Sequence, residues 1–130
     1  MMLYALTVER KPEYLHVKVT GDNNPQTVLK YLADVHSACS AHKCSNVLIE
    51  ENLEGPSLEI TDIYAVISER SKNTHPVVDR IAYVDMNRDH DSSRMKFAET
   101  VAVNRGVHVR VFADVSEAAN WLTSISDTSS

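Results

Sequence analysis

The residues with the clearest chemical pattern occupy every second position of one polar segment. They are Asp85, Asn87, Asp89 and Asp91. This spacing is typical of the first ligands of a calcium-binding loop, because Ca²⁺ prefers carboxylate and amide oxygens. The remainder of such a loop is missing, since position six is His90 where glycine is needed and position twelve is Lys96 where glutamate is needed. The pattern therefore favours a solvated acidic loop over a calcium site.

Imidazoles and thiols form a second group of potential metal ligands. They are His36, Cys39, His42 and Cys44. Nitrogen and sulfur suit Zn²⁺, but Cys39 continues the apolar stripe of an expected helix, where a thiol acts as a small core residue. No second ligand pair follows at zinc-finger spacing. We therefore expect no metal ligands and no cofactor.

Signals of catalysis are weak in this sequence. With three glycines the chain has no glycine-rich phosphate loop, and it has no Gly-x-Ser-x-Gly motif around a nucleophile. Six histidines and the acidic residues could supply acid–base groups, but no arrangement of them specifies a reaction. We favour a protein that is not an enzyme, and we assign no catalytic residue.

The elements that would position these residues follow from hydrophobic periodicity and from turn residues. Asn24-Pro25 opens a helix, with Asn24 as its cap, and Gly106 ends another. Strands are expected at 3–9, 13–20, 47–49, 81–84 and 107–112, and helices at 25–39, 57–72, 95–105 and 115–125. The order ββαβαβαβα predicts an α/β fold with a five-stranded mixed sheet and about four helices.

We expect these elements to form one domain over residues 1–126, followed by a frayed tail at 127–130. Right-handed crossovers between parallel strands that lie in chain order would place every helix on one face of the sheet. His16, Lys18 and Thr20 would then face solvent or a second subunit. The expected core is Leu15, Val17, Leu32, Val35, Leu48, Ile49, Ile63, Ile67, Ala82, Val84, Ala98, Val109, Val111, Ala118 and Leu122.

Length and composition are those of one globular domain. The chain has 130 residues, of which 43% are hydrophobic and 24% charged, enough for a single core. A net charge of −5 disfavours nucleic acid, because phosphate backbones attract a basic surface. No apolar run could span a bilayer, the first residues lack a signal-peptide pattern, and two cysteines form no disulfide framework. We expect a reduced, cytoplasmic protein.

Several segments resemble the STAS superfamily, and within it the bacterial SpoIIAA-like proteins, whose founding relatives are anti-sigma-factor antagonists. The segments that carry the resemblance are Arg80–Asp85, Lys96–Glu99, Val109–Phe112 and Ala118–Leu122, together with the turn Leu53–Pro56 after the third strand. The resemblance implies a single STAS-like domain that works by binding.

The best-understood STAS proteins carry a phosphorylatable serine at the start of the helix after the third strand, in an Asp-Ser-Ser-Gly-like turn. Ser57 takes that place here, but the preceding acid, the second serine and the following glycine are absent. A serine at a helix start is also an ordinary cap. We therefore expect Ser57 to be structural and not a switch.

Ligands of parallel α/β sheets gather beyond the carboxyl ends of the strands. Here that edge would carry residues 50–57, 85–93 and 113–116, and its many acids disfavour anionic nucleotides. The helices beside it offer more apolar side chains than one buried stripe needs. We expect a non-catalytic module that binds a protein partner or a small apolar, lipid-like ligand. The candidate binding residues are Leu53, Gly55, Ser57, Leu58, Ile63, Tyr64, Ile67, Met95 and Phe97.

The competing hypothesis is a small enzyme or a divalent-metal-binding protein that uses the acidic loops at the same edge. Analogy with lipid-carrier folds also leaves open a peripheral association with membranes. We expect a homodimer, because an uncovered sheet face or surplus apolar side chains would otherwise remain exposed.

Overall fold

The computed structural model describes residues 4–56, 58–59, 61–63, 65–66, 79–87, 90 and 92–128. The strands are β1 (Tyr4–Arg10), β2 (Leu15–Asp22), β3 (Asn46–Glu54), β4 (Arg80–Asp85) and β5 (Val109–Phe112). The helices are α1 (Pro25–His42), α3 (Ser92–Asn104) and α4 (Val115–Thr128). Between β3 and β4, residues 61–63 and 65–66 are also helical. α4 extends two residues into the segment that we expected to fray.

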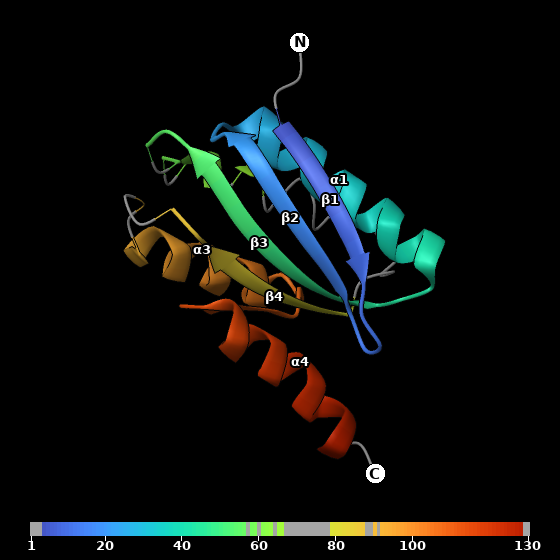
Figure 1. Cartoon of the computed structure of the whole chain (residues 1–130). Helices are drawn as coiled ribbons and strands as arrows, with labels where there is room; N and C mark the ends of the chain where they lie inside the picture. The colour runs from blue at the N-terminus through green and yellow to red at the C-terminus, as the bar shows by residue number, and fades with distance from the viewer. Residues whose placement is uncertain are drawn as a thin grey trace.

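The five strands form one sheet in chain order, β1-β2-β3-β4-β5 (Figure 1). β1 is antiparallel to β2, whereas the other neighbouring strands are parallel. This arrangement confirms the α/β fold with a five-stranded mixed sheet.

Helix α1 begins where the sequence predicts. The side chain of Asn24 accepts a hydrogen bond from the Thr27 backbone N–H at 2.9 Å, which caps the helix, and Pro25 follows it. The helix ends at Lys43, whose left-handed backbone (φ 52°) lets its N–H bond the last carbonyls. Its buried stripe is Thr27, Tyr31, Val35 and Cys39. Leu32, which we expected in the core, is only half-buried.

Side chains alternate between the two faces of the sheet, and each face has its own apolar cluster. On one face, α1 packs on a cluster that includes Val47 and Ile49 of β3. On the other, α4 packs on a cluster that includes Leu48 of β3 and Ala82 of β4. Figure 1 accordingly shows α1 and α3 behind the sheet and α4 in front of it.

The expectation that every helix lies on one face is therefore wrong for α4. The handedness rule applies to a helix that connects two parallel strands, such as α3 between β4 and β5. α4 follows the last strand, so no crossover fixes its side. It covers the apolar side chains that β3 and β4 direct to the second face, and Leu122 of α4 is 1% exposed there.

Most of the expected core is buried. The confirmed residues are Leu15, Val17, Val35, Leu48, Ile49, Ile63, Ala82, Val84, Ala118 and Leu122. Besides Leu32, three expected core residues are only partly buried, namely Ala98, Val109 and Val111. The two valines belong to β5, which is a terminal strand of the sheet and, among the described residues, has a neighbouring strand on one side only. Ile67 lies outside the described residues.

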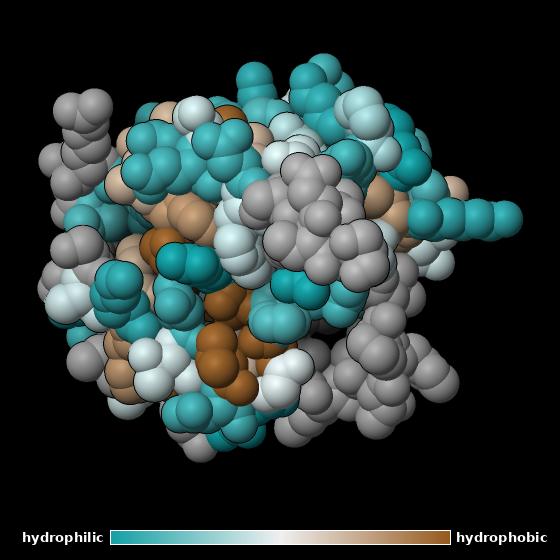
Figure 2. Space-filling view, turned by 90° about the horizontal axis from the view of Figure 1, so that it is seen from below, coloured by the Kyte–Doolittle hydropathy of each residue, from teal (hydrophilic) through white to brown (hydrophobic). Residues whose placement is uncertain are grey.

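α4 contacts β3, β4 and β5, and the same face of β2 is polar. Lys18 and Thr20 are exposed there, as the alternation predicts, and His16 Nε2 lies 3.1 Å from Glu50 Oε1. Seen from below, polar side chains cover much of the surface and an apolar area interrupts them (Figure 2). Within the described part of the chain, no helix is long and apolar enough to cross a membrane.

Candidate functional site

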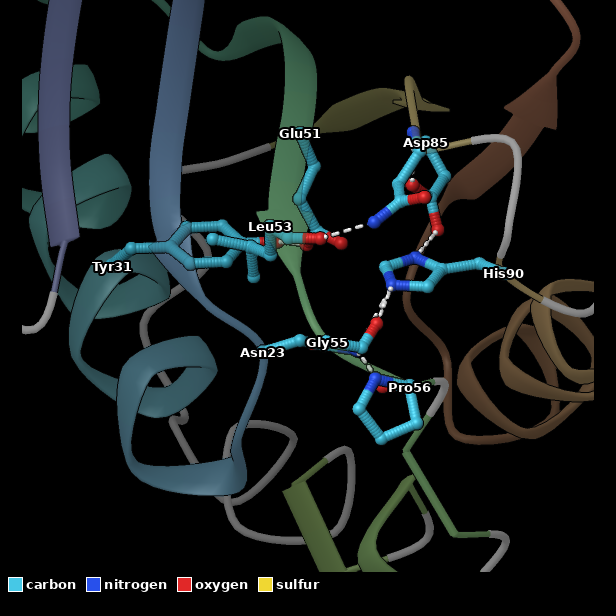
Figure 3. Close-up of polar contacts among 9 residues, drawn as sticks. Asn23, Tyr31, Glu51, Leu53, Gly55, Pro56, Asp85 and His90 are labelled. Atoms are coloured by element: carbon cyan, nitrogen blue, oxygen red, sulfur yellow. Dashed lines mark hydrogen bonds and ion pairs between the residues drawn. The ribbon is translucent and has the colours of Figure 1, made fainter.

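Two neighbouring sets of polar side chains, one around Glu51 and one around His90, lie where β3 and β4 end, at the edge of the sheet where the sequence places a site. Glu51 comes from β3 and Asp85 from the end of β4, and His90 follows in the loop after β4. Tyr31 reaches Glu51 from α1 (Figure 3). The two sets together therefore come from three segments that are distant in the sequence.

Glu51 is a buried acid, 3% exposed, on the same face of β3 as Val47 and Ile49. The hydroxyl of Tyr31 donates a hydrogen bond to Glu51 Oε2, and Tyr83 of β4 also bonds this carboxyl. Burial raises the pKa of Glu51 from 4.5 to about 7, although both tyrosines oppose this by bonding the carboxylate. The pKa values of both tyrosines lie well above 10, chiefly because of burial.

His90 is bound on both ring nitrogens by hydrogen-bond acceptors. Its Nδ1 lies 2.6 Å from Asp85 Oδ2, and its Nε2 lies 2.9 Å from the carbonyl oxygen of Gly55. A carboxylate and a carbonyl accept hydrogen bonds, so the doubly protonated ring satisfies both partners, while the Asn23 side-chain nitrogen also lies 3.4 Å from Nε2. The side chains of His90 and Asp85 are 4% and 8% exposed, so the contact is almost buried and is an ion pair when the ring is protonated.

The electrostatics of His90 agree with that geometry. Burial of the ring lowers the pKa of His90, but the hydrogen bond and charge of Asp85 and the bond to Gly55 raise it more, so the pKa lies above 6.5. The second carboxylate oxygen of Asp85 accepts the backbone N–H of Asn87 at 3.0 Å. Asp85 thus holds both the His90 ring and the backbone that follows β4.

Residues 53–56 and 58, which we call the clamped loop, comprise the last two residues of β3 and the segment after it, and they are held by side chains from other segments. Four of its carbonyl oxygens accept a side-chain hydrogen bond at 2.8–2.9 Å. The acceptor and donor pairs are Leu53 with Asn87, Gly55 with His90, Pro56 with Asn23, and Leu58 with Arg94. The loop is therefore fixed from the start of α1, from the loop after β4 and from α3.

Gly55 has a backbone conformation that only glycine adopts easily, with φ at 110°. An added Cβ would meet no atom within 4 Å. Glycine is thus needed for the turn itself and not for space. This turn directs the Gly55 carbonyl to His90.

The structure places the expected binding residues in different environments. Leu53 and Ile63 are buried, Gly55 is exposed, and Leu58, Met95 and Phe97 are half-buried. Arg94, next to Met95, bonds Leu58, so the beginning of α3 adjoins the clamped loop. The remaining candidates, Ser57, Tyr64 and Ile67, lie outside the described residues.

Sequence reasoning missed the Tyr31–Glu51–Tyr83 group and the central place of His90. One signal was available, because the alternation of β3 puts Glu51 on the same face as the apolar Ile49 and Leu53. A charged residue on an apolar face indicates a buried polar group with partners. No comparable local signal marks His90, whose partners come from β4 and from the clamped loop.

The carboxylates of both sets bind protein donors and not one another. Among the described residues, no three histidine, cysteine or acidic side chains are arranged to hold a metal ion. Two acids of the calcium-like pattern, Asp89 and Asp91, lie outside the described residues. The arrangement holds the His90 ring between Asp85 and the clamped loop and fixes the path of the loop backbone.

Comparison with known proteins places this geometry in a known fold. No family model matches the chain, and no curated protein matches it. An anti-sigma factor antagonist from Mycobacterium paratuberculosis superimposes with a TM-score of 0.57 at 13% identity, over 92% of this chain and 94% of that one. An uncharacterised DUF3478-family protein with a SpoIIAA-like fold, from Shewanella loihica PV-4, superimposes with a TM-score of 0.51 at 18% identity, over 92% and 93%. Identities this low establish the architecture alone, and the chain therefore has a SpoIIAA-like fold.

Proposed function

We propose that this protein is a non-catalytic module that binds a protein partner through the clamped loop and the adjoining start of α3. The observation that carries this proposal is that four carbonyls of one short loop are held by side chains from three other segments. A loop fixed in advance loses less conformational entropy when a partner binds. Because several polar side chains fix the conformation of this loop, the loop is a good candidate for the binding surface.

The outer side of the loop offers polar contacts to a partner. Glu54, Pro56 and Glu59 are exposed, and the carbonyls on the inner side are already bonded. Two exposed acids favour a partner with basic side chains opposite them. One structural neighbour is named an antagonist of an anti-sigma factor, which is itself a protein, and this name supports the same class of partner.

A small apolar ligand is favoured less by these contacts. Leu53 is 0% exposed and Ile63 8% exposed, so both would meet a ligand only after the loop moved. That movement would break the hydrogen bonds of Asn87 and His90 to the loop. The enzyme alternative is favoured less as well, because Glu51 and Asp85 already bind protein donors.

Site-specific photocrosslinking in the native host tests the proposal. A benzophenone amino acid would replace Glu54, Glu59 or, as the control, Glu13, which is exposed in the turn between β1 and β2. We expect one protein adduct from positions 54 and 59 and none of that mass from position 13. Lipid adducts at 54 and 59 would assign an apolar ligand instead, and identical adducts at all three positions would refute a binding loop.

A charge reversal supplies the matched solution test. Glu54→Lys should weaken binding of the crosslinked protein by about tenfold, whereas Glu13→Lys should leave it unchanged. Equal thermal melting of both variants would show that the loss is local. Equal affinity of both variants would place the partner elsewhere.

A further inference from the structure

Strand β1 leaves one edge of the sheet open. It is the terminal strand of the sheet, and among the described residues no other strand pairs with its outer side. Natural edge strands are usually protected by proline, lysine or a bulge. β1 has seven residues in continuous register with β2 and contains no proline, lysine or bulge, and its charged side chains, Glu9 and Arg10, lie only at its end. An edge of this kind is suited to pairing with another strand.

The backbone groups on the open edge can be identified from the hairpin. Lys11 N–H donates to the Tyr14 carbonyl at 2.9 Å, and bonded pairs alternate along an antiparallel ladder. Ala5, Thr7 and Glu9 therefore bond β2. The outward N–H and C=O groups belong to Tyr4, Leu6, Val8 and Arg10.

We propose that β1 pairs with β1 of a second copy of this chain, antiparallel and about a two-fold axis at Thr7, so that one sheet continues through both copies. Across the seam between the two β1 strands, residues whose N–H and C=O groups point away from β2 must lie opposite one another. The register that pairs all of β1 and obeys this rule sets Thr7 opposite Thr7 and Leu6 opposite Val8.

The same register brings complementary charges together. Arg10 falls opposite the partner's Tyr4, whose hydroxyl bonds the partner's Asp34 of α1. Arg10 makes no ion pair with another described residue of its own chain, and both Arg10 and Asp34 are exposed. Within one copy, the two ends of β1 lie about 20 Å apart. Arg10 can therefore reach an Asp34 carboxylate only across the seam.

This register also avoids charge repulsion on the other face of the sheet. Ala5 falls opposite Glu9, so no like charges meet across the seam. A second copy is favoured over an unrelated strand because both halves of the charge pair come from this chain. The surface differs from the clamped loop, so the dimer and the proposed partner can be tested separately.

Sedimentation velocity over a concentration series tests the pairing. At high micromolar concentration, we expect the main species to have twice the 14.5 kDa mass of the chain. Arg10→Glu should raise the dissociation constant by about tenfold at low salt, because it sets a glutamate against the partner's Asp34. This variant leaves the Tyr4–Asp34 bond intact, and the control Arg110→Glu makes the same change on the opposite edge strand.

The charge swap decides between this interface and any other. Asp34→Arg alone should weaken the dimer, and Arg10→Glu combined with Asp34→Arg should restore it to near the native dissociation constant. Restoration requires contact between copies, because the two positions do not meet within one chain. A monomer at all concentrations would overturn the proposal, as would a dimer that is insensitive to Arg10→Glu or is not restored by the double variant.

Discussion

Glu51 and His90 couple the protonation of two buried side chains to the stability of the fold. The folded-state pKa of Glu51 is about 7 against an ordinary 4.5, so its contribution is complete below pH 4.5 and is lost as pH rises through 7. The pKa of His90 is also raised, so its contribution is complete below 6.5 and is lost above that value. Both groups therefore make the folded state less stable as pH increases.

Glu51→Gln separates the two contributions. The amide carries no charge to bury and can still accept the Tyr31 hydroxyl, so we expect little change in stability near pH 5 and a gain of about 3 kcal/mol near pH 8. Urea unfolding at several pH values measures this difference. A native protein whose stability stays constant between about pH 5 and 7 would show that Glu51 ionises at its ordinary pKa.

At the scale of elements, two adjacent asparagines serve different parts of the fold. Asn24 caps α1 by accepting the Thr27 N–H, whereas the Asn23 side chain donates to the Pro56 carbonyl of the clamped loop at 2.8 Å. The start of α1 and the clamped loop are therefore held by neighbouring side chains with separate partners.

Alanine at each position should give a distinct pattern of hydrogen exchange. Asn24→Ala should cost about 1 kcal/mol and speed exchange in the first turn of α1, because a cap is lost. Asn23→Ala should speed exchange in residues 54–59 with a smaller loss of stability, because it frees one end of the clamped loop. Identical exchange patterns in the two variants would contradict this division.

At the scale of the whole molecule, the sheet carries a separate apolar cluster on each face. Leu48 belongs to the cluster beneath α4 and is 0% exposed, while Leu32 lies on α1 and is only half-buried. The two leucines therefore test how fully each helix is packed.

Leu48→Ala should cost about 2–5 kcal/mol, because it opens a cavity between α4 and the sheet. Leu32→Ala should cost clearly less, since part of its side chain already meets water. Both values can be read from urea denaturation under the same conditions. Equal losses would mean that Leu32 is more deeply packed than its exposure indicates.

The sequence by itself determined the α/β class, the mixed five-stranded sheet, the edge that carries the polar site and the start of α1 at Asn24. These features depend on neighbouring residues: periodicity, caps, and the right-handed connection of parallel strands. Tertiary structure alone decided that Tyr31 rather than Leu32 lies in the core, that α4 covers the second face, and that His90 meets Gly55. Each of these outcomes depends on contacts between segments that are far apart in the chain. Such contacts produce no periodic pattern in the sequence of either segment.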